Sequence, residues 1–322
     1  MPNFQQPFSP EVMVKIYLIT DCICLFLATL NITGNSIILR LFYSGRLDSR
    51  RNLRIILYIA VSDIAFSVSI LPQVFYMVGN WEPSYLDYDA VVMAASGWPL
   101  AMFLKISLGL NVGAAIERIV ALYFPLIYRK IDHVKCSKVL MTICVLFGSI
   151  DTILSILSFR FEQRINCSSI GCFVNNIFRT YWGASNMVCG VIIIVMTIFV
   201  FCKVQKLSRQ SGRSKSLSNA SAAQKFRQAN RTTCGALLSC LFCLTIPSFL
   251  VSLIETLTGF SVFEKVGAFY IASLLSSGLM NCLIFLILNG SVKSRVDRNV
   301  SDAITTIAHS KPSKPTIFVD WT

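Results

Sequence analysis

The chain has 322 residues, of which 54% are hydrophobic and only 14% charged, and its mean hydropathy is +0.64. This composition excludes an ordinary soluble domain, because several runs approach or exceed the ~20 apolar residues that cross a bilayer. The net charge of +13 would suit a nucleic-acid partner. However, the basic residues alternate with the apolar runs instead of gathering on one domain, so we expect no nucleic acid and a lipid bilayer instead.

Seven apolar runs are long enough to be transmembrane helices. They cover 16–42, 54–78, 91–123, 139–159, 181–204, 232–255 and 267–289. The predicted fold is therefore an all-α membrane protein, a seven-transmembrane helix bundle over 16–300. Residues 1–15 form an N-terminal tail, and residues 301–322 form a C-terminal tail.

The distribution of Lys and Arg predicts the orientation of this bundle. Most of the 29 Lys and Arg residues follow the first, third, fifth and seventh spans. The segments on the other side hold few, namely Lys15, Arg160, Arg164, Arg179 and Lys265. Cytoplasmic loops carry the excess of basic residues, so we expect the N-terminus outside and the C-terminus in the cytoplasm.

The third span ends in an acid and an arginine, Glu117 and Arg118. Such charges at the edge of hydrocarbon are costly unless they are paired or reach water, so they mark function. With the Pro-Leu and Tyr that follow, the block resembles the Asp-Arg-Tyr motif of rhodopsin-like G-protein-coupled receptors, although Ile119 replaces the motif's tyrosine. The resemblance implies heterotrimeric G-protein coupling through Glu117, Arg118, Pro125, Leu126 and Tyr128. The alternative to a coupling site is a ring of basic side chains that only extend to the lipid headgroups.

Several polar residues inside the spans match the sodium pocket of the resembled receptors. They are Asn35, Asp63, Ser107, Ser277 and Asn281. A carboxylate as deep as Asp63 needs a cation, a proton or hydrogen-bond donors, and Ser107 lies three helical turns before Arg118 on the same face. We expect the cluster to hold Na⁺ at Asp63 and Ser107, or to protonate Asp63 instead. The alternative is a water-filled network without an ion, and no other cofactor is expected.

Lys105 and Asp151 are charged residues that the receptor motifs do not account for. Each lies near the middle of its span, and the third and fourth helices are neighbours in the resembled fold. Unpaired charges would be expensive at that depth, whereas an ion pair largely offsets the cost. We therefore predict a Lys105–Asp151 ion pair at the floor of a ligand pocket, available to an acidic or polar ligand; a purely structural pair is the alternative.

The loop after the fourth span carries two cysteines and a glycosylation sequon. Of the 12 cysteines, only Cys167 and Cys172 fall on the outer, oxidising side, which predicts one local disulfide. In the resembled receptors a cysteine near the start of the third span forms a disulfide with this loop, but Met93 occupies the matching position. Asn166 begins an Asn-Cys-Ser sequon on the same side and is the expected glycosylation site.

The sixth span contains Pro247 where the resembled receptors place a kink, so we expect a hinge there. The tryptophan that these receptors carry in the sixth span is replaced by Thr245, and the aspartate of an amine receptor is replaced by Leu100. We assign Thr245 and Leu100 to the ligand pocket.

The segment Lys203–Arg231 is basic and serine-rich. Its first half is expected to be disordered, and from Ala222 a helical extension of the sixth span is expected.

Three features resemble nematode serpentine chemoreceptors of class BC. They are the Glu-Arg-Ile variant of the motif, the absence of a cysteine near the start of the third span, and the segment 171–182. This resemblance implies a plasma-membrane receptor of sensory neurons, in a sensory cilium, that binds a small environmental molecule and activates a G protein. A non-signalling scaffold or a transporter with seven helices is the alternative. An enzyme is not expected, because neither His133 nor His309 has partners at metal or triad spacing.

The orientation can be tested with an epitope tag at the N-terminus. We expect an antibody to reach this tag on intact cells, and to reach a C-terminal tag only after the cells are permeabilised. The opposite pattern would invert the topology and place Arg118 on the outer side.

Overall fold

The computed structural model describes residues 10–44, 54–83, 85–162, 165, 167–211, 220–258 and 268–288. Within these residues, seven helices are long and apolar enough to cross a membrane, as predicted. They are α1 (Pro10–Tyr43), α2 (Arg54–Gly79), α3 (Ala90–Tyr123), α5 (His133–Leu157), α6 (Asn176–Ser211), α7 with η3 and α8 (Ala220–Cys240, Leu241–Thr245, Ile246–Thr258) and α10 (Phe269–Leu288). Two short elements join them, α4 (Pro125–Lys130) and the 3₁₀ turn η1 (Ile170–Cys172).

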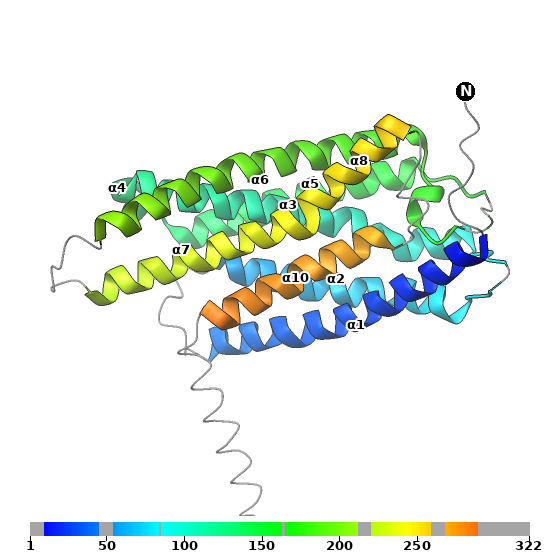
Figure 1. Cartoon of the computed structure of the whole chain (residues 1–322), viewed down its shortest axis with the longest axis horizontal. Coiled ribbons are helices and arrows are strands. Elements are labelled where there is room, and N and C mark those ends of the chain that lie inside the picture. The colour runs from blue at the N-terminus through cyan, green and yellow to red at the C-terminus, as the bar shows by residue number, and fades with distance from the viewer. Residues whose placement is uncertain are drawn as a thin grey trace, which may run out of the picture.

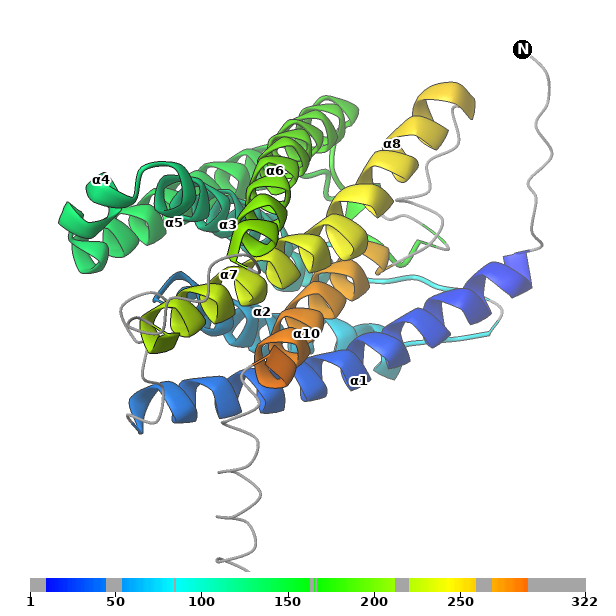
Figure 2. The same cartoon turned by 60° about the vertical axis from the view of Figure 1, so that its left-hand side comes forward.

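The long helices lie side by side along one axis (Figure 1). We call the end where α3 meets α4 the Arg118 end, and the opposite end, which carries η1, the disulfide end. Helix α3 is central, because it contacts α2, α5, α6 and α7. Helix α1 lies at the margin against α2 and α10 (Figures 1 and 2).

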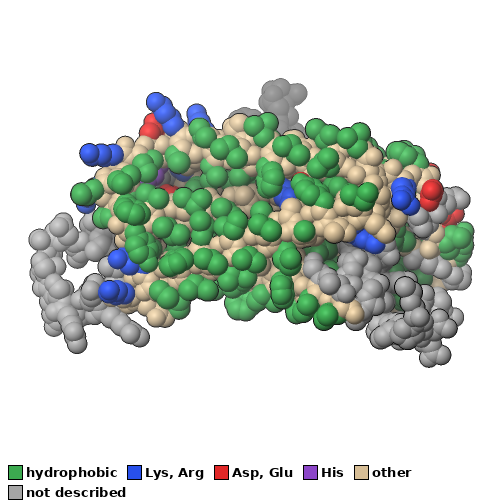
Figure 3. Space-filling view, turned by 90° about the horizontal axis from the view of Figure 1, so that it is seen from above, with side chains coloured by type: hydrophobic (Ala, Val, Ile, Leu, Met, Phe, Trp, Pro, Cys, Tyr) green, Lys and Arg blue, Asp and Glu red, His purple; other side chains and the backbone are tan. Residues whose placement is uncertain are grey.

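The outer surface of the bundle is apolar along its length. Phe26, Leu157, Ile177 and Ile287 are each more than half exposed. In Figure 3 hydrophobic side chains cover the middle of the visible face, while most Lys and Arg lie toward its two ends. An apolar belt with charged ends is the pattern that a bilayer requires of a spanning protein.

Short polar caps and one proline set the helix ends at the loops. Asp89 and Asp132 accept hydrogen bonds from the first backbone amides of α3 and α5, which satisfies donors that have no partner inside the helix. Helix α3 stops before Pro125, because a residue that precedes proline avoids the helical conformation. Pro125 then occupies the first turn of α4, where its missing N–H costs nothing.

The sixth span is interrupted just before Pro247. The five residues Leu241–Thr245 form a π-helical turn between α7 and α8. Proline cannot donate the backbone hydrogen bond that would continue a regular ladder, and helices bend where that ladder is broken. The predicted hinge position therefore coincides with an irregular turn, although movement at this turn stays a prediction.

Two expected boundaries differ from the observed ones. Helix α1 begins at Pro10 and so takes in the second part of the expected tail, and α6 continues to Ser211. The expectation of disorder from Lys203 was therefore wrong as far as Ser211, because the apolar run before it extends the helix into the polar segment. Helix α7 begins at Ala220, close to the expected start at Ala222.

Gly278 offers a test of how closely the helices pack. A Cβ atom at this position of α10 would lie 2.8 Å from the Asn31 side-chain amide and 2.9 Å from Asp63 Cγ. We expect Gly278→Ala to destabilise the protein by roughly 1–3 kcal/mol, a typical cost of overpacking, measured as a lower thermal midpoint in detergent. Gly79→Ala is the matched control, because nothing lies within 4 Å of its Cβ position; equal effects of the two variants would contradict this packing.

Candidate functional site

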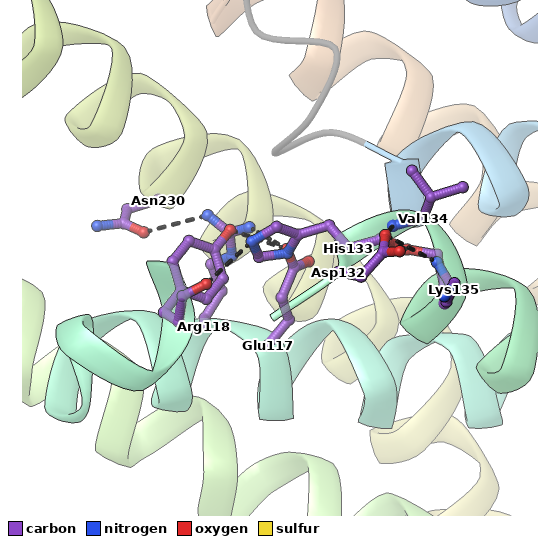
Figure 4. Close-up of polar contacts among 9 residues, drawn as sticks. Glu117, Arg118, Asp132, His133, Val134, Lys135 and Asn230 are labelled. Carbon is purple, nitrogen blue, oxygen red and sulfur yellow. Dashed lines mark hydrogen bonds and ion pairs between the residues drawn. The ribbon is translucent and has the colours of Figure 1, made fainter. Parts of the chain in front are cut away.

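Arg118 is buried at its end of α3, with only 1% of its surface exposed. Its Nη2 lies 3.0 Å from Glu117 Oε1, and its Nη1 lies 3.5 Å from Asn230 Oδ1 of α7. Figure 4 shows the guanidinium between these two partners. An amide at the outer limit of hydrogen-bond distance is a weaker partner than a carboxylate, so the contact with Asn230 is weaker than the contact with Glu117.

Glu117 connects Arg118 to the next loop. Its Oε1 accepts a hydrogen bond from the Tyr128 hydroxyl at 3.0 Å and lies 3.8 Å from His133 Nδ1. His133 Nε2 lies 3.1 Å from the backbone carbonyl oxygen of Tyr128, and because a carbonyl only accepts, Nε2 carries the proton. Burial raises the pKa of Tyr128 to about 12, so its hydroxyl stays protonated and remains a donor at neutral pH.

Helix α4 presents its side chains outward beside this cluster. None of its residues is buried, and Leu126 is 76% exposed. Pro125 and Leu126 are therefore accessible, whereas Tyr128 is half-buried against Glu117. The five residues predicted at the Arg118 end thus lie together around the junction of α3 and α4.

The predicted sodium-pocket residues lie inside the bundle, and two of them are joined by hydrogen bonds to further polar residues. Asn35 donates to Asn31 Oδ1 at 2.6 Å, and Asn31 in turn donates to Ser67 Oγ at 2.9 Å. The Ser107 carbonyl accepts a hydrogen bond from Asn111. The structure therefore extends the predicted cluster by Asn31, Ser67 and Asn111.

Four buried oxygens of this cluster have no hydrogen-bond partner among the residues that the structure describes. They are Asp63 Oδ2, Asn111 Oδ1, Ser277 Oγ and Asn281 Oδ1. Carboxylate, amide and hydroxyl oxygens are ligands that a hard cation prefers, and unpaired buried oxygens are costly. This donor set fits Na⁺, and a proton on Asp63 or bound waters would satisfy part of it.

The predicted ion pair between Lys105 and Asp151 is present. Lys105 Nζ lies 3.4 Å from Asp151 Oδ2, and both side chains are completely buried. Lys105 also donates to Ser185 Oγ and Asn186 Oδ1 at 2.6 Å each, and Tyr181 donates to Asp151 Oδ1 at 2.9 Å. The charges are thus enclosed by neutral partners from α6, as a buried pair requires.

Two cavities lie at the disulfide end, one helical turn beyond this pair. Leu100 lines both of them, whereas Lys105 and Asp151 line neither. Thr245 lies in η3, with its methyl group against Gly190 of α6. Of the four residues assigned to a ligand pocket, only Leu100 therefore faces these cavities.

The predicted Cys167–Cys172 disulfide is present. The loop around it is tied to α5 by the backbone pairing of Phe159 with Val174, and the rings of Phe159 and Phe173 stack at 5.7 Å. The expected glycosylation site, Asn166, lies outside the described residues.

Several partners of the predicted site residues were not predicted from the sequence. Asn230, Ser185, Asn186 and Tyr181 contact Arg118 or the Lys105–Asp151 pair from other helices. Polar side chains at the buried positions of apolar helices were the available signal, because each needs a partner inside the membrane. Which helix supplies that partner depends on how the bundle packs.

The fold is similar to that of squid rhodopsin. The crystal structure of squid rhodopsin matches with a TM-score of 0.67 and 13% sequence identity, covering 94% of this chain and 89% of the squid chain. This likeness and the seven apolar helices define the class as multi-pass membrane proteins with the rhodopsin-like seven-helix fold. No curated protein sequence matches the chain.

Residues 13–290 match the family model described as serpentine type 7TM GPCR chemoreceptor Srbc. The chain belongs to this family of seven-transmembrane chemoreceptors. The resemblance predicted from Glu117-Arg118-Ile119 and from the segment 171–182 is thereby confirmed at the level of the family.

The Lys105–Asp151 pair can be tested by removing one charge at a time. We expect Lys105→Met to destabilise the protein by roughly 3–5 kcal/mol, because it leaves Asp151 buried beside no cation. The double variant Lys105→Met/Asp151→Asn should recover part of this loss. Thermal midpoints of the purified variants measure both effects, and a double variant less stable than Lys105→Met would contradict the pairing.

Proposed function

We propose that the chain is a chemosensory receptor that binds a small molecule at the disulfide end and activates a heterotrimeric G protein at the Arg118 end. The observation that carries this proposal is the state of Arg118. It is buried between α3 and α7, and the hydrogen bond that joins it to Asn230 of α7 is long and is made to a neutral amide. An arginine held in this way can exchange its partners at little cost.

The excess of Lys and Arg supports an orientation with the Arg118 end in the cytoplasm. In that orientation the exposed α4, with Pro125 and Leu126, lies where a cytoplasmic partner can reach it. The disulfide lies on the outer side, where thiols become oxidised. The receptor would then act at the plasma membrane of a sensory cell, in its cilium.

Activation is a shift between two arrangements of the bundle. A small molecule between the outer halves favours the arrangement in which α7 swings about η3 and Pro247, away from α3. Arg118 then leaves Asn230 and lines an inner cleft for a helix of the G protein. A ligand shifts this equilibrium only by its differential affinity for the two arrangements.

Sodium would favour the resting arrangement. Ser277 and Asn281 of α10 and Asp63 of α2 supply oxygens to one cluster, so an ion held there joins these helices. A cation bound by the resting state alone stabilises that state by mass action. Below the two cavities, the Lys105–Asp151 pair supports the floor of the ligand site without facing it.

The coupling step can be tested in cells with a second-messenger readout. We expect Arg118→Ala to abolish G-protein activation, while surface expression and ligand binding persist, because the arginine acts on the G protein and not on the ligand. Leu126→Ala should weaken activation without abolishing it. Full signalling by Arg118→Ala would overturn the proposal and would favour a non-signalling scaffold.

Asn230 should set the basal activity. Asn230→Asp replaces a long neutral hydrogen bond with a charge-assisted one, which is roughly twice as strong, so we expect lower ligand-independent activation. Asn230→Ala should raise it, because it removes this hydrogen bond between α7 and Arg118. Nucleotide exchange on a purified G protein measures both, and an unchanged basal rate in both variants would show that Asn230 does not restrain the switch.

A further inference from the structure

The two cavities at the disulfide end adjoin each other and share two lining residues. The first lies among α3, α5 and α6 and is lined by Gly97, Ser155, Phe178 and Trp182. The second lies between α2 and α10 and is lined by Gln73, Ser168 and Tyr270. Leu100 and Ile170 line both cavities.

Ile170 is a plug that the disulfide loop inserts between the two cavities. It begins the 3₁₀ turn η1, and the Cys167–Cys172 bridge closes the loop around it. Its Cδ1 atom lies only 2.6 Å from the position that a Cβ atom on Gly97 would take. Only a glycine on α3 leaves room for this close approach.

The aromatic residues provide a continuous wall behind the plug. The ring of Trp182 stacks on Phe178 at 6.5 Å and meets the edge of Tyr270 at 5.3 Å. Because Trp182 lines the first cavity and Tyr270 the second, this wall joins them. Moving or truncating Ile170 would therefore convert two small chambers into one longer pocket.

The lining carries almost no charge. Arg179 is the one ionisable cation or acid among the described residues that line the two cavities, and its guanidinium donates a hydrogen bond to Asn176 on the exposed side of α6. Lys105 and Asp151 neutralise each other beneath the floor. Polar groups are few, chiefly Ser155 in the first cavity and the Gln73 amide in the second.

A cationic ligand would meet no acid among the described lining residues, and an anionic ligand would have to compete for Arg179, which already donates a hydrogen bond to Asn176. Either ligand would lose its hydration on entering the site, which is costly. An apolar ligand with one neutral polar group would instead pack against the aromatic wall and form a hydrogen bond with one hydroxyl or amide of the lining. Ligand pockets commonly combine an apolar lining with a few polar groups in this way. We propose that the ligand is a short, uncharged molecule with an apolar body and one hydrogen-bonding group, and that Ile170, seated against Gly97, sets its maximum length.

This inference rests on the proposed function, but its test needs no G protein. The probe is a series of straight-chain primary alcohols from butanol to decanol, added to the purified full-length chain in lipid nanodiscs, with the thermal midpoint as the readout. Chain-matched carboxylates and alkylammonium ions are measured beside them. We expect the short alcohols to raise the midpoint up to a definite chain length, with an affinity at least roughly tenfold higher than that of either charged series.

Variants of the plug should move this length limit in opposite directions. Ile170→Ala should extend it by roughly two carbon atoms, since it empties space between the cavities. Ile170→Val should extend it less, and serves if the alanine variant does not fold. Gly97→Ala should shorten it by pushing Ile170 into the cavities, and Gly97→Ala/Ile170→Ala should restore the longer limit. Ile177→Ala, on an 80% exposed side chain at the same end, is the control and should leave the limit unchanged.

Three results would overturn the inference: no alcohol that stabilises the wild-type chain, equal stabilisation by the charged series, or one length limit for all plug variants. None of these affects the proposed coupling. If another ligand still activates a G protein in an Arg118-dependent manner, the receptor function stands and only the ligand class is wrong.

Discussion

The buried polar groups of α3 must find their partners inside the bundle, because the surrounding hydrocarbon offers none. Lys105, Asn111 and Arg118 lie along this one central helix, and each is completely or almost completely buried. Lys105 joins α3 to α5 and α6, and Arg118 joins it to α7. The polar groups of α3 therefore determine which helices are held to the centre, and how firmly.

The two charged anchors of α3 are held with different strength. Lys105 has an ion pair, two short hydrogen bonds and the Phe147 ring at 5.4 Å. Arg118 pairs with a partly exposed carboxylate from its own helix, and its hydrogen bond to the Asn230 amide of α7 is long. The contacts that Lys105 makes to α5 and α6 beneath the cavities are thus shorter than the hydrogen bond that joins Arg118 to α7. This difference suits the proposed release of Arg118.

The π-helical turn at Leu241–Thr245 lies between these two regions. Its irregular ladder and the adjacent Pro247 separate α8, at the disulfide end, from α7, which carries Asn230. Such a break concentrates bending in a few residues. The proposed swing of α7 would pivot at this break.

The sequence by itself determined the seven spans, the Glu117–Arg118 junction, the Cys167–Cys172 disulfide and the Lys105–Asp151 pair. The spans and the disulfide follow from one-dimensional rules, namely apolar length and the number of cysteines on one side. The Glu117–Arg118 junction and the Lys105–Asp151 pair follow from the depth of the charges together with the resemblance to rhodopsin-like receptors. The sequence did not determine Asn230 as the partner of Arg118, Asn31 as the partner of Asn35, or Ile170 as the plug against Gly97. Those contacts join helices or loops that are distant in the chain, and only the packing of the bundle decides which side chains face each other.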